Sequence, residues 1–252
     1  MKVNAMTFNI RYDNKDDGKN RFDGRKAIIK KFFGENKPDV IGFQEVEDNQ
    51  RRWLIDNLED YTVLGMGRNA DYSGESVSIA YRKDKFDIVS FEQYWLSDTP
   101  YVPGSKYKID QSPCPRISVQ ATLVDHSGNL FTFANTHLDH WGVHARVCGA
   151  SLLISKLLQS RHPFILTGDF NEFPDGKAIK EILGNKGVHD LTRTISKHTA
   201  TYHGYGAVKK DCKIDYIFSS GKAVKETLKM HTECEGGIYL SDHYPISVDV
   251  EL

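Results

Sequence analysis

Short apolar runs recur along this chain of 252 residues, and four of them end in a polar side chain. The polar residues Asn9, Glu45, His137 and Asp169 follow the apolar segments 3–8, 40–43, 131–135 and 164–166. Loops that leave a rigid sheet commonly carry functional groups, so we expect a site at these junctions. An acidic group directly after a buried strand loses hydration unless a partner offsets the cost, and a divalent cation would be such a partner.

The spacing of apolar residues predicts a chain of mixed strands and helices. Strands are predicted at 3–10, 40–43, 61–66, 76–81, 86–96, 117–124, 130–135, 164–166, 214–218, 223–230 and 246–250. Helices are predicted around 27–33, 51–58, 145–158 and 179–183, with Asp23 as a candidate cap for the first. Two strand-and-helix halves favour an α/β fold in which two mixed sheets pack face to face with helices outside. No linker divides the chain, so we expect one domain over residues 1–252.

Composition restricts the cellular setting and the kind of substrate. The formal net charge is -1, whereas a dedicated nucleic-acid binder usually has a basic excess, although a neutral total can hide a local basic patch. The four cysteines form no CxxC pair, which argues against a zinc clip or a thioredoxin motif. Without an apolar signal segment or a run of 18 apolar residues, we expect a cytoplasmic monomer with no membrane insertion.

The polar junctions offer chemistry suited to a phosphoester. Asn9 and Glu45 supply oxygen ligands, which suit Mg²⁺ or Mn²⁺ better than zinc. Asp169 and Asn171 point to one face of an extended segment, because they are two residues apart. There the carboxylate can orient or deprotonate a water, and the carboxamide can donate a hydrogen bond to a phosphate oxygen.

A second carboxylate and an imidazole, Asp242 and His243, lie near the C-terminus. A carboxylate beside an imidazole holds one tautomer and makes the ring more basic. Asp215 is a candidate partner for His243, in a pair that only the fold can form.

Taken in order, the motifs at 9, 44–45, 135–137, 168–171, 214–216 and 241–243 resemble the endonuclease/exonuclease/phosphatase superfamily. That superfamily includes DNase I-like nucleases, inositol polyphosphate 5-phosphatases, sphingomyelinases and deadenylases. The resemblance covers nearly the whole chain. It implies a four-layer α/β/β/α sandwich and Mg²⁺- or Mn²⁺-dependent phosphoester cleavage through in-line attack by water.

The resemblance also implies roles for the metal-side residues. Glu45 matches the principal metal ligand, Asn9 supports the metal site, and Asp242 lies near the metal. Asp169 matches the residue that orients or activates the attacking water. Whether one or two metals act is left open.

On the phosphate side, His137 and Asn171 match residues that bind the scissile phosphate and stabilise its transition-state charge. His243, polarised by Asp215, matches a phosphate ligand or an acid/base. Whether Asp169 or His243 is the base is not decided by the sequence.

Three further residues, Arg116, Arg146 and Asp139, are candidates for substrate contact. Arg146 could clamp a phosphate from a predicted helix, or it could be a solvated helix charge. The charged segment 11–25 is expected to be a solvated loop.

The segments around 95–100, 103–105, 115–116 and 135–140 are similar to a bacterial group of small stand-alone members described as metal-dependent hydrolases. Arg11 stands where some DNA-repair members carry an acidic residue, which argues against an apurinic-site endonuclease. We therefore predict a metal-dependent hydrolase of a small or medium phosphodiester or phosphomonoester. The alternatives are a nuclease acting on DNA or RNA and a non-catalytic binding module on the same fold.

Overall fold

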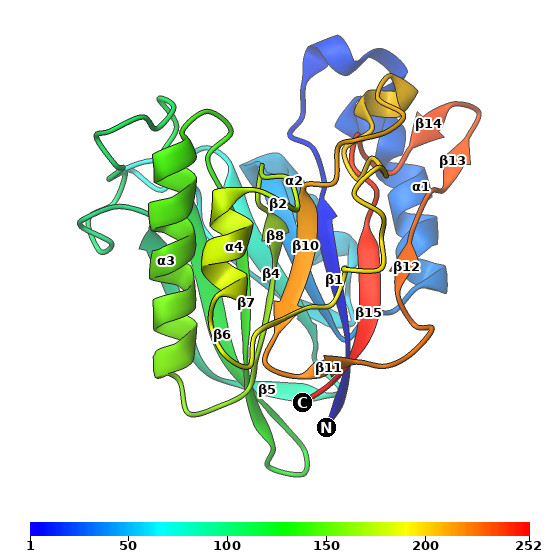
Figure 1. The fold of residues 1–252 in the computed structure, drawn as a ribbon. Helices are drawn as coiled ribbons and strands as arrows, with labels where there is room; N and C mark the ends of the chain where they lie inside the picture. Colours follow the sequence, from blue (N-terminus) through cyan, green and yellow to red (C-terminus); the bar gives the residue numbers. More distant parts are fainter.

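The computed structural model describes residues 1–252, in which two β-sheets pack face to face between pairs of helices (Figure 1). The first sheet has the strand order β11-β15-β1-β2-β4-β3, with β12 also paired to β15. Its strands are β1 (Lys2–Asn9), β2 (Val40–Val46), β3 (Tyr61–Leu64), β4 (Ser76–Arg82), β11 (Lys222–Ala223), β12 (Lys229–Met230) and β15 (Ile246–Glu251).

The second sheet has the strand order β5-β6-β7-β8-β10-β9. Its strands are β5 (Phe86–Trp95), β6 (Ile117–Asp125), β7 (Leu130–His137), β8 (Phe164–Asp169), β9 (His189–Asp190) and β10 (Asp215–Ser219). The helices are α1 (Phe22–Glu35), α2 (Asp48–Asn57), α3 (Val143–Gln159) and α4 (Lys177–Leu183), with 3-10 turns η1 (Lys15–Asn20) and η2 (Gly204–Gly206). A separate hairpin pairs β13 (Cys234–Glu235) with β14 (Ile238–Tyr239).

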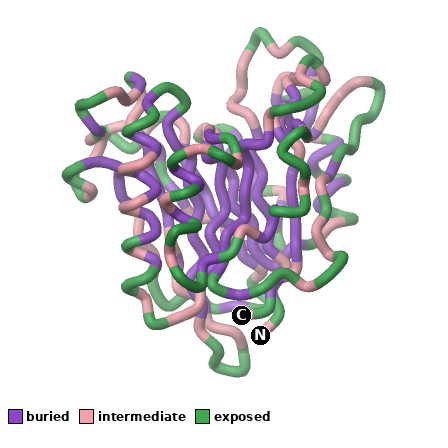
Figure 2. The backbone as a smooth tube through the Cα atoms, in the orientation of Figure 1, coloured by how far each residue is buried: buried purple, intermediate pink, exposed green.

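Three apolar clusters hold these layers together. One lies between the sheets, where Val3 and Ile79 of the first sheet pack with Val119 and Phe133 of the second. The other two lie beneath the helices, under α3 and α4 on one side and under α1 and α2 on the other. Buried backbone is accordingly concentrated in the central strands, and exposed backbone in the outer turns (Figure 2). The predicted four-layer sandwich is confirmed.

Each sheet contains one parallel pair, β1 with β2 and β7 with β8, and the other pairings are antiparallel. These registers position the predicted site. His137 lies opposite Asp169 in the parallel pair, and Asp215 lies opposite Asp169 in the antiparallel pair of β10 with β8. Three polar residues that are distant in sequence are thus brought to adjacent strand ends.

A buried polar network ties the two sheets together just below these strand ends. The amide of Asn135 donates to the carbonyl oxygens of Phe43 (2.7 Å) and Ser78 (2.9 Å), and its oxygen accepts from Gln44 (2.7 Å). Gly42 allows this approach, because a Cβ there would lie 2.6 Å from the Asn135 oxygen. Buried polar groups that are paired across the sheets in this way fix the relative position of the layers.

Two expectations from the sequence are wrong. The strand predicted at 223–230 is interrupted: β11 and β12 flank a turn in which Glu226 has a left-handed φ of 63°. Asp23 does not cap α1, since it lies inside the first turn and the cap position is Arg21. The short strand β9 and the β13–β14 hairpin were not predicted, because two-residue strands carry no measurable periodicity.

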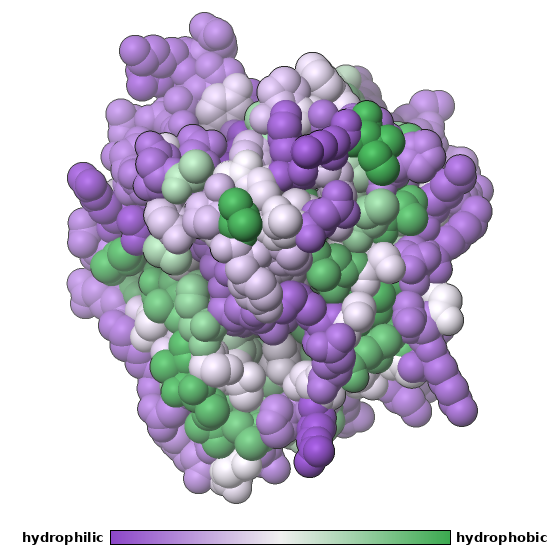
Figure 3. All heavy atoms as spheres, turned by 90° about the vertical axis from the view of Figure 1, so that its left-hand side faces the viewer, coloured by the Kyte–Doolittle hydropathy of each residue, from purple (hydrophilic) through white to green (hydrophobic).

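None of the helices combines the length and apolar character needed to cross a membrane. Seen from the α3 side, the surface is a mosaic of hydrophilic and hydrophobic atoms (Figure 3). Leu158 of α3 is 46% exposed, and scattered apolar exposure of this kind is normal for a folded domain.

Candidate active site

A cleft of about 470 Å³ opens where β1, β2, β7 and β8 end and β10 begins. Six of the predicted catalytic and metal-site residues line it, together with the predicted substrate contact Arg116. The six are Glu45, His137, Asp169, Asn171, Asp242 and His243. Asn9 lies beneath them and contacts Glu45 and Asp169 through its amide. The structure therefore gathers residues from both halves of the chain in one place.

The floor of the cleft contains a buried line of carboxylate, imidazole and carboxylate. Nδ1 of His243 lies 3.0 Å from Oδ2 of Asp215, and Nε2 lies 3.8 Å from Oδ2 of Asp169. Burial, together with the charge of Asp215, raises the pKa of Asp169 to about 7. Burial alone would lower the pKa of His243, but the surrounding carboxylates outweigh it and raise that pKa to about 10.

Asn9 links the two acidic sides of the cleft. Its amide nitrogen donates to Oε1 of Glu45 and to Oδ2 of Asp169, each at 3.0 Å. The other oxygen of Glu45 accepts from the backbone nitrogen of Tyr12 (3.2 Å). Donor atoms of Glu45, His137 and Asp169 all lie within 4.8 Å of one another, which is close enough to share one cation.

His137 and Asn171 form the opposite side of the cleft. The amide nitrogen of Asn171 lies 3.0 Å from Nε2 of His137 and donates to the carbonyl oxygen of Leu138 (3.0 Å). Burial lowers the pKa of His137 well below its usual value, and the charges of Arg116 and Arg68 add to the shift. A neutral His137 beside a carboxamide can exchange hydrogen bonds with a phosphate oxygen.

Asp242 completes the acidic side and is held by Arg11, whose Nε lies 3.5 Å from its Oδ2. Burial raises the pKa of Asp242, and the charge of Glu45 acts in the same direction. Asp242 is 3% exposed, so an uncompensated charge there would be costly.

Three residues of the cleft have a left-handed backbone: Arg11 (φ 61°), Glu45 (φ 60°) and Asn171 (φ 47°). Such conformations cost roughly 1–3 kcal/mol for side chains with a Cβ and persist where the surroundings impose them. They turn the chain sharply after β1 and β8 and at the irregularity between Phe43 and Val46 of β2, which directs the functional side chains into the cleft rather than along the strands.

A cationic wall, consisting of Arg68 and Arg116, flanks His137. His140 lies beside it, and burial together with the charge of Arg116 lowers the pKa of its imidazole. Arg116 is 5% exposed and its Nη2 lies 2.7 Å from Nδ1 of His140. Arg68 is held by Glu75 through two hydrogen bonds of 2.6 and 3.1 Å. Arg68 and Glu75 were not anticipated, since neither belongs to a recognisable motif. Both line the cleft together with Tyr12 and Tyr202.

Arg146 and Asp139, two of the candidate substrate contacts, do not line the cleft. Asp139 accepts from the backbone nitrogens of Ser112, Trp141 and Gly142, so it orders the turn that begins α3. Arg146 pairs with Glu172 (3.2 Å) and donates to the carbonyl oxygen of Asp139 (3.0 Å). In this geometry both residues support the loops that carry His140 and Asn171.

The charged segment 11–25 is not simply a solvated loop, because Arg25 is fully buried. Its guanidinium donates to the carbonyl oxygens of Ile10 (2.6 Å) and Leu240 (2.8 Å). It also donates to the carbonyl oxygens of Asn20 and Arg11. The hydrogen bonds of Arg25 therefore link the segment after β1 to the segment that carries Asp242.

Comparison with known proteins gives a consistent result. A family model described as "Endonuclease/Exonuclease/phosphatase family" matches residues 6–243. No curated protein matches the sequence significantly. Many solved structures match. One is an endonuclease/exonuclease/phosphatase from Bacteroides vulgatus, with 32% identity and a TM-score of 0.91 over 100% of this chain and 99% of that one.

Two other solved structures are informative. A mannosyl-6-phosphatase from Bacteroides thetaiotaomicron is 28% identical, with a TM-score of 0.85 over 99% of this chain and 100% of that one. The human Nocturnin catalytic domain is 19% identical, with a TM-score of 0.75 over 99% and 93% of the two chains, and shows likeness of fold alone.

Proposed function

Because this chain belongs to the endonuclease/exonuclease/phosphatase family, we propose that it is a divalent-metal-dependent hydrolase of small phosphoesters, with a preference for phosphomonoesters. The observation that supports this most strongly is the buried Asp169–His243–Asp215 line. It meets Glu45 and Asn9 on one side and the cationic wall on the other.

The donors of the cleft suit a divalent cation. Glu45 and Asp169 converge with only the Asn9 amide between them, and Asp242 is buried nearby. We propose that Glu45 holds the ion with support from Asn9 and Asp242, and that it is Mg²⁺ or Mn²⁺, which favour oxygen ligands. When bound, such an ion supplies Lewis-acid stabilisation of the phosphoryl charge.

Asp169 and His243 have different roles in proton transfer. Asp169, with a pKa of about 7, is poised near neutrality to accept a proton from the attacking water. His243, with a pKa of about 10, carries a proton at neutral pH, so it serves as a cationic donor and not as the base. Asp215 holds the ring through Nδ1 and stabilises its charge.

His137 and Asn171 then act on the phosphate. Their side-chain nitrogens lie 3.0 Å apart, which is close enough for both to contact the same phosphate group. Preorganised donors of this kind stabilise charge that develops in the transition state, typically by about 3–4 kcal/mol for each donor.

The preference for monoesters comes from the cationic wall. A monoester phosphate carries up to two negative charges and no second ester arm. It therefore matches the cationic wall of Arg68 and Arg116 better than a diester does. A cleft of about 470 Å³ suits a small leaving group such as a sugar. The similarity to a mannosyl-6-phosphatase supports a sugar phosphate as the first substrate to test.

The test is a panel assay with Mg²⁺ and with Mn²⁺. It compares hexose 6-phosphates, p-nitrophenyl phosphate, bis-p-nitrophenyl phosphate and single-stranded oligonucleotides, with Asp169→Asn as the blank. We expect monoester turnover well above diester turnover, abolished in the variant. Faster cleavage of oligonucleotides would favour the nuclease alternative. No turnover of any compound would favour a non-catalytic binding module.

A further inference from the structure

A second cavity, of about 830 Å³, lies away from the active-site cleft. It is a groove between β9, at the end of the second sheet, and β11, at the end of the first. The two sites lie at opposite ends of β10: Asp215 contacts His243 of the cleft, and Phe218 pairs with Asp190 beside the groove. Asp215 and Phe218 are three positions apart on the strand, a distance of roughly 10 Å.

The floor of the groove is an uncovered part of the core between the sheets. Leu191 is 5% exposed and belongs to the inter-sheet cluster, and Leu228 packs against that cluster while lining the groove. Val188 and Leu183 add apolar surface from the α4 side, and Leu183 is 40% exposed. Each terminal strand has only one partner, β9 with β10 and β11 with β15, so no strand closes the gap between the sheets.

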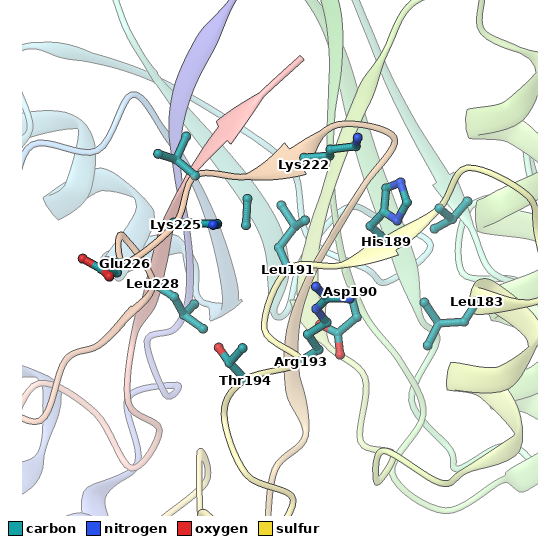
Figure 4. Close-up of a pocket in the computed structure, with 13 residues that line it drawn as sticks. Leu183, His189, Asp190, Leu191, Arg193, Thr194, Lys222, Lys225, Glu226 and Leu228 are labelled. Atoms are coloured by element: carbon teal, nitrogen blue, oxygen red, sulfur yellow. The ribbon is translucent and has the colours of Figure 1, made fainter.

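The rim of the groove is cationic. Arg193, Lys222 and Lys225 line it, all are exposed, and no carboxylate lies within 4.0 Å of any of them. His189 adds an imidazole. Figure 4 shows Lys225 on one side of Leu191 and His189 on the other.

The acidic residues of the groove leave this charge largely uncompensated. Asp190 is turned to its own loop, where its carboxylate accepts from the nitrogen and hydroxyl of Thr192 at 2.7 and 2.6 Å. Its other oxygen lies 3.7 Å from the buried amine of Lys213. Glu226 is the remaining carboxylate on the lining, against three unpaired cations.

We propose that this groove binds a small amphipathic anion: a carboxylate or sulfonate-like head on an apolar chain or ring. The apolar residues at the bottom of the groove would contact the apolar part of the ligand, and the cations at the rim would contact its negatively charged group. The volume lies in the range of small-ligand sites, about 300–1,000 Å³. The site is separate from the phosphoesterase cleft, so the inference stands or falls independently of the proposed function.

The test uses anilinonaphthalene sulfonate as a fluorescent probe, with octanoate and octanol as competitors. The wild-type protein should show one saturable probe site, and octanoate should displace the probe at a concentration at least tenfold below that of octanol. The triple variant Arg193→Gln/Lys222→Gln/Lys225→Gln should weaken octanoate binding at least tenfold. The matched control Lys108→Gln/Arg161→Gln/Lys209→Gln removes three exposed cations elsewhere and should bind as wild type does.

A second variant, Ala223→Trp, fills the groove and should abolish binding of both probe and octanoate. Circular dichroism and thermal unfolding of each variant establish that it is folded. Equal displacement by octanol and octanoate would overturn the proposal, as would equal loss in the control triple or a probe signal that does not saturate. A wild-type dimer that becomes a monomer in Ala223→Trp would also overturn the proposal, because the groove would then be covered by a second copy of the chain.

Discussion

Oδ2 of Asp215 lies 3.0 Å from Nδ1 of His243, in a buried contact between β10 and the segment that leads into β15. The contact fixes the ring so that Nε2 faces Asp169 across the floor of the cleft. It also makes the imidazole strongly basic, because the nearby carboxylates favour the protonated form. We therefore propose that Asp215 acts on the reaction through His243.

Replacement of Asp215 by Asn should therefore reduce kcat by about 10²–10⁴ with little change in KM, because the cation on His243 is no longer stabilised. Steady-state kinetics with the best monoester substrate measures the effect. Asp211→Asn is the matched control, since Asp211 also contacts a histidine, His198 (2.6 Å), but at the surface. Equal loss in both variants, or none in Asp215→Asn, would contradict the assigned role.

Glu45→Gln tests the metal site. Removal of the charge from the main proposed ligand should raise the Mn²⁺ concentration for half-maximal activity at least about tenfold. An ion present at 100 times its dissociation constant stabilises the folded protein by about 2.7 kcal/mol, so the melting temperature of the wild type should rise with Mn²⁺ and fall with a chelator. The variant should lose this response.

Exposed Glu59→Gln serves as the control for the metal experiment and should keep both the activity and the thermal response. A Glu45→Gln protein with unchanged metal response would remove Glu45 from the metal site.

The sequence was sufficient to place the strand ends at the cleft but not the wall beside them. His137 and Asp169 each follow an apolar run, Asp215 begins one, and sheet register brings the three together. Arg68 and Glu75 belong to the connection between β3 and β4, where no periodicity or motif distinguishes a cleft residue from a solvated one.

Arg25 shows a second limit of sequence reasoning. In a charged segment at the start of α1 it looks like a surface residue, yet it is fully buried and donates to four carbonyl oxygens. Those acceptors come from Ile10, Arg11, Asn20 and Leu240, and only the tertiary fold brings them together. Local pattern cannot reveal a buried charge whose partners are distant backbone atoms.

Arg116→Gln should separate monoester from diester recognition. The guanidinium is buried beside His137, so its loss removes charge from the wall and should lower kcat/KM for a phosphomonoester by about 10- to 100-fold. Hydrolysis of bis-p-nitrophenyl phosphate should fall less. The control is Arg82→Gln, which removes an arginine paired with exposed Asp84 far from the cleft. An equal fall for both ester types would mean that Arg116 does not set the preference.

Asn135→Ala should destabilise the fold rather than affect the chemistry directly. It leaves the carbonyl oxygens of Phe43 and Ser78 without this buried donor. It also removes one of the acceptors of the Gln44 amide. Unsatisfied buried groups cost about 1–3 kcal/mol each, and partial relaxation should leave a loss of about 2–4 kcal/mol in the free energy of unfolding, measured in urea. Asn49→Ala, at an exposed pair with Asp13, should cost less than about 0.5 kcal/mol.

His203 should make the protein less stable in mild acid. Burial lowers its pKa to about 4, and the charge of His243 adds to the shift, whereas in the unfolded chain the pKa is about 6.5. Between these values the unfolded state binds the proton and the folded state does not. The stabilising contribution of the neutral His203 ring is therefore fully present above about pH 6.5 and is lost as the pH falls toward 4.

The variant His203→Gln loses the ring stacked on Tyr244 (centroids 3.8 Å apart), which lowers stability at every pH. Its urea midpoint should nevertheless fall less than that of the wild type between pH 7.5 and 4.5, while His126→Gln, in the exposed β6–β7 turn, should follow the wild type. Parallel pH profiles for His203→Gln and the wild type would show that His203 does not titrate with folding.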